Sequence, residues 1–160
     1  MIKLISMLSV VMLVSASCNK NEVTPTDELN NATQIKNTRA NFEKLSGKWI
    51  FKEYLKDKTV PANSEATIEF SKGESSDILI VNGRSFVNLY STSFTYNEAQ
   101  STIQIAAPIG MTKMAGTPEQ MKAERDFHSN LQNVKKFAVE GNTLKLYVGE
   151  PATEVMFFNQ

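Results

Sequence analysis

The sequence predicts an α+β domain that is mostly β, with antiparallel strands and one helix. Short runs of β-branched, aromatic and aliphatic residues, separated by turn residues, recur from residue 45 onward. A single segment, at about 118–131, carries the apolar repeat of an amphipathic helix. Parallel strands would need repeated crossover helices, so antiparallel pairing is expected. A chain of 160 residues has room for one such domain and an extension.

The expected strands are short and separated by turn signals. They lie at 48–55, 67–70, 77–81, 84–90, 93–96, 102–106, 134–139, 143–148 and 154–158. Asn82-Gly83 is expected to form a type I′ hairpin turn, because both central residues of that turn need positive φ. Gly141-Asn142 is expected to act similarly, so the last strands should form an antiparallel meander.

The expected helix has a well-marked start. Thr117 is a suitable N-cap, Pro118 suits the first helical position, and Gln120 completes a capping box. The apolar face comprises Ala123, Phe127, Leu131 and Val134. Such a helix is expected to cover an open sheet or to close one end of a barrel.

The N-terminal residues resemble a bacterial lipoprotein signal. Residues 1–17 hold one charge, Lys3, and an apolar run too short to span a bilayer comfortably. Small residues then precede Cys18, which is expected to be acylated and to anchor the chain in the membrane. Ser15 stands where the lipoprotein pattern prefers Leu, Val or Ile. The alternative is simple cleavage after Ser17, with Cys18 left free.

Residues 18–41 are expected to form a flexible tether, and residues 42–160 the domain. The tether is rich in Asn and Thr, and all aromatic residues lie at Phe42 or later. The rival interpretation places a helix within 27–44, with Leu29, Ile35 and Phe42 as a sparse apolar stripe. The Asn and Thr content favours no more than a short turn before Leu45.

Composition argues against several classes of function. Lys and Arg total 17 and Asp and Glu total 17, so no basic excess points to a nucleic-acid partner. One Cys permits no intrachain disulfide. Glu124 and His128, four apart on the helix, are too few for a zinc site and are interpreted as a solvent-facing pair. Ser129 points away from His128 on a helix, so it is no nucleophile for that imidazole.

Three methionines could form a loose thioether site for Cu(I), namely Met111, Met114 and Met121. Core packing is the preferred interpretation, because methionine commonly fills gaps in cores. The scattered glycines form no phosphate-binding loop. No cofactor and no metal are therefore expected.

Several weak motifs occur in the order found in one family. They include Leu45-Ser46-Gly47-Lys48-Trp49, Gly83 followed by Asn88 and Tyr90, and Thr112-Lys113-Met114-Ala115. This order resembles the META domain of HslJ-like proteins. The resemblance implies a partly open antiparallel barrel with one helix, and no general catalytic activity. It implies structural roles for Gly47, Trp49, Gly83, Asn88, Tyr90, Thr112 and Met114.

The family often has two cysteines where this chain has Val87 and Gly116. Their joint absence is expected if the two positions are neighbours in the fold, because one cysteine alone would leave an odd thiol. Any redox role of that pair is then absent from this chain.

Many members of the family are envelope lipoproteins, and some are associated with heat shock or secretion. The sequence therefore predicts a monomeric lipoprotein of the bacterial cell envelope, expected at the outer membrane, that acts as a non-catalytic protein-interaction or envelope-stability module. One alternative is a carrier that holds a lipid or hydrophobic molecule in the barrel interior. The other is an enzyme using Glu124 and His128.

Overall fold

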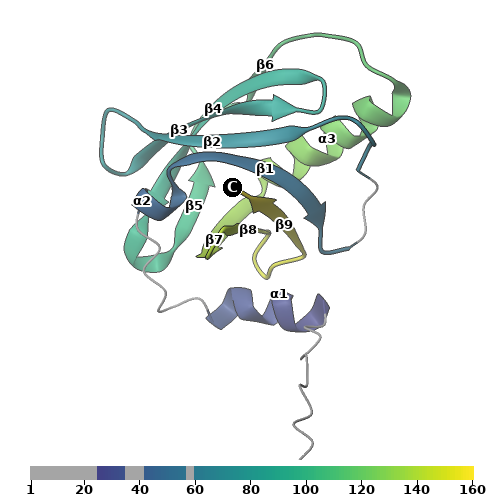
Figure 1. Cartoon of the computed structure of the whole chain (residues 1–160). Helices are drawn as coiled ribbons and strands as arrows, with labels where there is room; N and C mark the ends of the chain where they lie inside the picture. The colour runs from purple at the N-terminus through teal and green to yellow at the C-terminus, as the bar shows by residue number, and fades with distance from the viewer. Residues whose placement is uncertain (1–24, 35–41, 57–59) are drawn as a thin grey trace, which may run out of the picture.

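A computed structural model describes residues 25–34, 42–56 and 60–160 (Figure 1). The expected signal at residues 1–17 and the lipidation site Cys18 lie outside the described residues. So does most of the expected tether. Among the residues that are described, no helix has the length and apolar character needed to cross a membrane.

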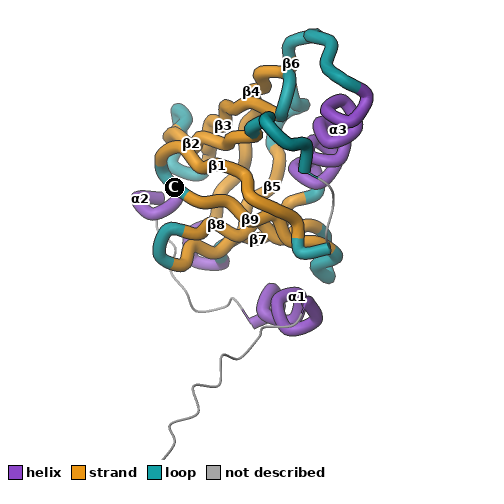
Figure 2. The backbone as a smooth tube through the Cα atoms, turned by 45° about the vertical axis from the view of Figure 1, so that its right-hand side comes forward, coloured by secondary structure: helices purple, strands orange, loops and turns teal. Residues whose placement is uncertain are grey.

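The core of the fold is a ring of eight antiparallel strands (Figures 1 and 2). Around the ring the order is β3-β2-β1-β9-β8-β7-β5-β4, and a β3–β4 pairing closes it. A short strand, β6, also pairs with β4. The strands are β1 (Gly47–Tyr54), β2 (Ala66–Lys72), β3 (Ile78–Ser85), β4 (Asn88–Asn97), β5 (Thr102–Ile105), β6 (Gly110–Met111), β7 (Val134–Glu140), β8 (Thr143–Val148) and β9 (Glu154–Asn159). The predicted mostly-β, antiparallel, barrel-like class is confirmed.

The junction with the fewest strand pairings in the ring lies between β5 and β7. One register pair, Thr102 with Lys136, joins these strands. Next to it, the Phe137 N–H donates a hydrogen bond of 3.2 Å to the carbonyl oxygen of Ser101. The barrel expected to be partly open is thus closed, with its least-paired junction here.

Helix α3 (Pro118–Gln132) packs against one end of the barrel (Figure 2). Its predicted capping box is confirmed, because Thr117 accepts from the Gln120 N–H and the Gln120 side chain accepts from the Thr117 N–H. Phe127 enters the core edge-to-face against Phe51 at 5.6 Å and Phe86 at 6.0 Å between ring centroids. The buried aromatic side chains that fill the core are Trp49, Phe51, Tyr54, Phe70, Phe86, Tyr90, Phe94, Tyr96, Phe127, Phe137 and Phe158.

The prediction of a hairpin turn at Asn82-Gly83 is wrong. Both residues lie inside β3, and the chain reverses at Phe86 and Val87 instead. Phe86 adopts a φ of 68°, which is rare for a large side chain. Burial of its ring among the core aromatics favours this turn, which local preference alone would not select. The second predicted turn, at Gly141-Asn142, does connect β7 to β8, and Gly141 has a φ of 58°.

Two further helices precede the barrel. The chain forms α1 (Pro25–Gln34) within the segment expected to be a flexible tether, so over these residues the rival helical interpretation was the better one. Helix α2 (Phe42–Leu45) is the short turn expected before Leu45. A 3-10 turn, η1 (Glu98–Gln100), follows β4. In Figure 1, α1 lies beneath the barrel, on the side away from β4 and β6.

Candidate functional site

A polar cluster, buried except for Thr112, connects α3 to the β3–β4 hairpin and to the segment after β6. We call it the Glu124 cluster, and it consists of Ser85, Asn88, Thr112, Glu124 and His128. Glu124 is 3% exposed and His128 is 6% exposed. The interpretation of Glu124 and His128 as a solvent-facing pair is therefore wrong. The β3–β4 hairpin covers this side of α3, and the spacing of residues along the helix does not predict that contact.

The Glu124 carboxylate accepts hydrogen bonds from both ends of the hairpin turn. The Ser85 hydroxyl lies 3.0 Å from Oε2, and the Asn88 backbone and side-chain N–H groups donate over 2.8 Å and 2.7 Å. The Val87 N–H donates over 3.3 Å. Burial by itself raises the pKa of Glu124, but these donors outweigh it and the pKa is lowered. Glu124 therefore holds the turn together as a carboxylate.

Asn88 extends this network to the segment after β6. Its Oδ1 accepts from the Thr112 hydroxyl at 2.8 Å and from the Met114 N–H at 2.7 Å. Its Nδ2 also lies 3.3 Å from the Met114 carbonyl oxygen. Three family-motif residues, Asn88, Thr112 and Met114, are thus brought together by these contacts.

The imidazole of His128 is held by Ser85, whose Oγ lies 2.8 Å from Nε2. One hydroxyl hydrogen can be donated once, so donation to Glu124 leaves Ser85 to accept from Nε2–H. In this tautomer Nδ1 carries no hydrogen, and within the described structure it has no hydrogen-bond partner. Burial lowers the pKa of His128, and the charge of Glu124 opposes this only in part.

This arrangement is unlike an activated nucleophile. In a catalytic triad the carboxylate holds the imidazole nitrogen that faces away from the serine. Here Glu124 binds the Ser85 hydroxyl, and Ser85 is 0% exposed. These hydrogen bonds hold α3 to the β3–β4 hairpin, and the buried Ser85 hydroxyl is not accessible to a substrate.

The described residues contain no group of three or more His, Cys, Asp or Glu side chains that could hold a metal ion. The methionines differ from the expected core packing. Met111 and Met114 are each 45% exposed, and the Met121 sulfur lies 3.3 Å from the Gly116 N–H. The preferred core interpretation is therefore wrong for Met111 and Met114, because the segment that carries them runs along the outside of β4.

Gly83 and Tyr90 lie directly opposite each other on β3 and β4. A methyl group at Gly83 would overlap the Tyr90 ring and the backbone carbonyl oxygen of Thr67. The absence of a side chain lets the Tyr90 hydroxyl cross β3 and donate to that carbonyl oxygen over 3.0 Å. The Arg84 backbone N–H donates a hydrogen bond of 3.2 Å to the Thr67 hydroxyl oxygen. Gly83 is needed here for close approach rather than for a turn.

The remaining motif residues lie at the start of β1 and beside the hairpin. Gly47 has a φ of 106°, and the buried Trp49 donates its indole N–H to the Leu45 carbonyl oxygen over 2.9 Å. A methyl group at Gly116 would lie 2.5 Å from Cγ2 of Val87. The two positions where the family often carries cysteines are therefore neighbours in space, as expected.

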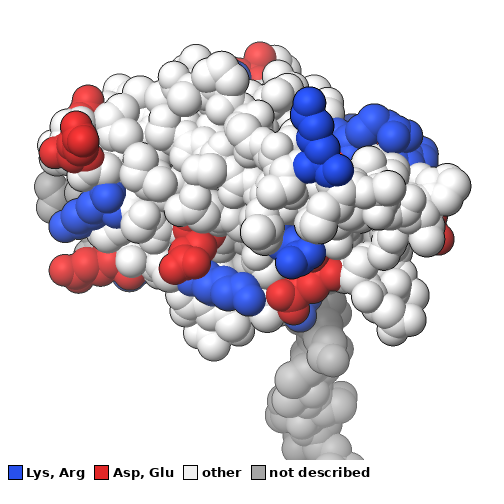
Figure 3. All heavy atoms as spheres, turned by 90° about the horizontal axis from the view of Figure 1, so that it is seen from above, with Lys and Arg blue, Asp and Glu red and all other residues white. Residues whose placement is uncertain are grey.

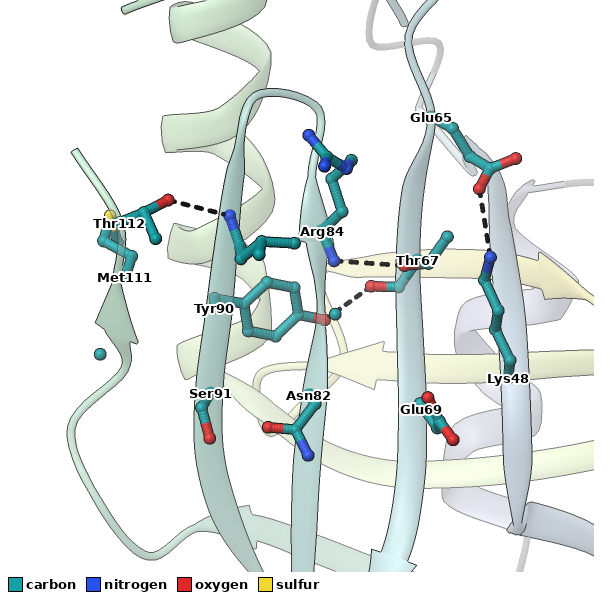
Figure 4. Close-up of a pocket in the computed structure, with 13 residues that line it drawn as sticks. Lys48, Glu65, Thr67, Glu69, Asn82, Arg84, Tyr90, Ser91, Met111 and Thr112 are labelled. Atoms are coloured by element: carbon teal, nitrogen blue, oxygen red, sulfur yellow. Dashed lines mark hydrogen bonds and ion pairs between the residues drawn. The ribbon is translucent and has the colours of Figure 1, made fainter. Parts of the chain in front are cut away.

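A groove of about 680 Å³ crosses the outer face of β1, β2, β3, β4 and β6 (Figure 4). We call it the outer groove. It is lined by Lys48, Glu65, Thr67, Glu69, Asn82, Gly83, Arg84, Leu89, Tyr90, Ser91, Gly110, Met111 and Thr112. It shares Thr112 with the Glu124 cluster, so the cluster supports one end of the groove.

The strand register explains the shape of the outer groove. One row of paired positions runs from Lys48 through Glu69, Asn82 and Ser91 to Gly110. Side chains become small toward β6, which leaves a hollow beside the exposed Leu89 and Met111.

Charged side chains line the groove from β1 to β3, where Arg84 pairs in register with Leu89, and the exposed apolar side chains lie at the β6 end. At the β1 end, Lys48 and Glu65 form an exposed ion pair of 3.6 Å, whereas the β6 end carries Leu89, 50% exposed, and Met111. Seen from above, the molecule has a broad uncharged area with basic and acidic residues interspersed around it (Figure 3). No continuous basic surface is visible on this face.

Sequence reasoning found the motif residues but missed the outer groove and Ser85. The groove is assembled from residues of five strands, so it depends on register. Ser85 carried no signal of its own, because its partners Glu124 and His128 come from a distant helix. The exposure of Met111 had one signal, a segment containing Pro108 and Gly110 that suits a sheet edge.

Comparisons with solved structures and with family models find similarity to this chain. A comparison with curated proteins finds no match. Among solved structures, an NMR structure of a protein from Burkholderia xenovorans has a TM-score of 0.56 and 13% identity, covering 97% of each chain. A DUF4847 family protein from Bacteroides vulgatus has a TM-score of 0.49 and 13% identity, covering 74% of this chain and 96% of that one. The family model for the META domain matches residues 40–160 of the sequence, so this chain belongs to the META domain family.

Proposed function

We propose that the chain is a lipid-anchored protein of the bacterial cell envelope whose META domain binds another envelope protein without catalysing a reaction. The single observation that carries the binding role is the outer groove, which ends at the exposed apolar side chains of Leu89 on β4 and Met111 on the short edge strand β6. The anchor rests on the signal and Cys18 in the sequence.

The chemistry of the groove suits a polypeptide partner. Leu89 and Met111 offer flexible apolar contact, and methionine adapts well to varied partner surfaces. Strand β6 pairs with β4 and with no other strand of the described structure. A sheet edge of this kind can receive an extended segment through backbone hydrogen bonds. Lys48, Glu65 and Glu69 would add charge selectivity toward the other end, and Arg84 would add a positive charge beside Leu89.

The alternative carrier function has less support. It requires a ligand cavity inside the barrel, where the core aromatics described above are packed against one another. The outer groove lies on the other side of the barrel wall and is open to solvent. A lipid held there would remain in contact with water along its length, which disfavours an apolar ligand.

Site-specific crosslinking tests the binding surface. A photoreactive amino acid at Met111, in cells that express the full chain, should yield one reproducible protein adduct. Leu89→Asp should remove this adduct, because it places a charge in the apolar end of the groove. Asn142→Asp is the matched control, since Asn142 is exposed in the β7–β8 turn, and it should leave the adduct intact. Persistence of the adduct in Leu89→Asp would refute the groove as the binding site.

The anchor has its own test. Growth with an alkyne analogue of palmitate should label the full chain and place it in the membrane fraction. Cys18→Ser should abolish both labelling and membrane association, because this chain has no other cysteine. Labelling that persists in Cys18→Ser, or an unlabelled parent chain, would contradict lipid anchoring.

A further inference from the structure

Helix α1 covers an apolar area on the outside of the barrel, which we call the α1 patch. The patch is formed by Ala138, Tyr147, Val155 and Phe157 on β7, β8 and β9. Tyr147 is 1% exposed and Val155 is 0% exposed, although both point away from the barrel core. Leu29 of α1 packs against this patch. The β7–β8–β9 wall is therefore buried on both faces.

A buried ion pair fixes the position of α1 on the patch. Lys145 of β8 extends its Nζ to 3.0 Å and 3.2 Å from the two carboxylate oxygens of Glu28. Its Nζ also lies 3.0 Å from the Glu140 carboxylate. The side chains of Lys145 and Glu28 are 10% and 12% exposed. Because a buried charge needs its partner, this contact favours one seating of α1 over others.

The ionised state of Lys145 is consistent with this role. Burial lowers its pKa, but the hydrogen bonds and charges of Glu140 and Glu28 outweigh burial, so the pKa is raised. Loss of α1 would remove one of these two carboxylates and expose Tyr147 and Val155. Docking of α1 therefore satisfies both the apolar and the charged groups of this wall.

Helix α1 lies between the proposed anchor and the domain. It precedes residues 40–160, which match the META family. Residues 19–24 separate Cys18 from Pro25 and can span at most about 20 Å. Without docking, residues 19–41 could span about 80 Å. Docking thus decides how far the barrel can move from the anchor.

The ring order places the outer groove on the opposite wall. In the closed ring, β8 lies across from β3 and β9 lies across from β4. Figure 1 shows the same relation, with α1 below the barrel and β3, β4 and β6 above. We propose that α1 is a docking helix that holds the β7–β8–β9 wall toward the lipid anchor and turns the outer groove away from the membrane. This inference rests on the anchored protein proposed above.

Energy transfer from the protein to the membrane measures this orientation. A dye is attached at Leu89→Cys in the groove or at Asn142→Cys in the β7–β8 turn, in full-length lipidated protein in vesicles that carry an acceptor on lipid headgroups. Acylated Cys18 has no free thiol, so the dye reaches the new cysteine alone. Transfer should be higher from position 142 than from position 89. Equal transfer from both positions would overturn the proposal.

Two substitutions in α1 separate docking from other effects. Leu29→Asp places a charge against the α1 patch and should abolish the difference in transfer between the two dye positions. Asn30→Asp adds the same charge at the neighbouring exposed residue and should preserve it. Fluorescence of the buried Trp49 verifies that the barrel is folded in both variants. A difference that survives in Leu29→Asp would overturn the proposal.

Failure of the anchor gives a different result. If Cys18 is not acylated, the parent chain fails to enter vesicles and Cys18 itself takes the dye. Docking is then measured by hydrogen exchange in the full chain. Protected α1 amides that lose protection in Leu29→Asp, but keep it in Asn30→Asp, support docking. Rapid exchange throughout α1 in the parent chain refutes docking whether or not the anchor exists.

Discussion

Replacement of Asn88 by Ala should destabilise the domain more than any exposed substitution on the same strand. Asn88 is 2% exposed and its side chain makes four hydrogen bonds, to Glu124, Thr112 and the backbone N–H and C=O of Met114. Neutral hydrogen bonds contribute about 1 kcal/mol each and one to a carboxylate about 2 kcal/mol. Water can replace part of this at Thr112 and Met114, which are exposed. The expected loss is about 3–4 kcal/mol.

Urea unfolding followed by Trp49 fluorescence measures this loss, because Trp49 is the one tryptophan of the chain and is 0% exposed. Ser91→Ala, an exposed position further along β4, is the matched control and should change stability by no more than about 0.5 kcal/mol. Asn88→Asp keeps the oxygen that accepts from Thr112 but places a carboxylate against Glu124. Of the three variants, Asn88→Asp should therefore be the least stable at neutral pH.

A loss below about 1 kcal/mol in Asn88→Ala would refute the reasoning, because the network would then not hold the hairpin and the segment after β6 together. A similar loss in Ser91→Ala would refute it as well, since the effect would not depend on these hydrogen bonds.

Three further predictions concern the same region. Gly83→Ala should cost at least about 3 kcal/mol in a urea titration, because the added methyl group overlaps the backbone of β2; a near-neutral result would contradict the close approach. Val87→Cys combined with Gly116→Cys should form a disulfide on mild oxidation, seen as two fewer reactive thiols, whereas unreacted thiols would contradict their proximity. Stability should fall as the pH drops below 6.5, the ordinary pKa of His128, because burial favours its neutral form and the unfolded chain binds the proton more readily. His128→Gln should make the free energy of unfolding nearly independent of pH between pH 6.5 and about 5. This window lies above the range where Glu124 protonates. An unchanged slope of the unfolding free energy against pH would show that His128 is not the group responsible.

The predicted strands and the observed strands agree best where a continuous apolar run is bounded by turn residues. In β9, predicted at 154–158 and observed at Glu154–Asn159, apolar residues and turn signals define the segment locally. The start of α3 was predicted correctly for the same reason, because a capping box is a contact between near neighbours in the chain. Local chemistry was sufficient for these elements.

The Asn82-Gly83 turn shows why local chemistry fails elsewhere. This dipeptide favours a hairpin, yet the pairing of β3 with β2 and β4 keeps it extended, and Gly83 serves the crossing of Tyr90. The turn moves to Phe86, whose positive φ is opposed by local sterics and supported by core packing. The sum of distant contacts exceeds one local preference.

The candidate site divides in the same way. Family-motif residues such as Asn88 could be named from the order of motifs, and Glu124 with His128 from helical spacing. Their burial could not, because it depends on the hairpin that packs over α3. Helix α1 was underestimated because an Asn- and Thr-rich segment has a weak propensity for helix and gains its stability from the barrel. Outward apolar residues at Tyr147 and Val155 were the signal that something covers that wall.

The sequence by itself determined the class of the domain, most of its strands, the start of α3 and the family to which the chain belongs. These depend on side-chain period, turn chemistry and motif order, which are properties of neighbouring residues. Tertiary structure alone decided the position of the β3–β4 turn, the burial of the Glu124 cluster, the outer groove and the docking of α1 on the opposite wall. Each of these depends on which distant side chains meet across the barrel, and that is fixed only when strand register and helix packing are fixed together.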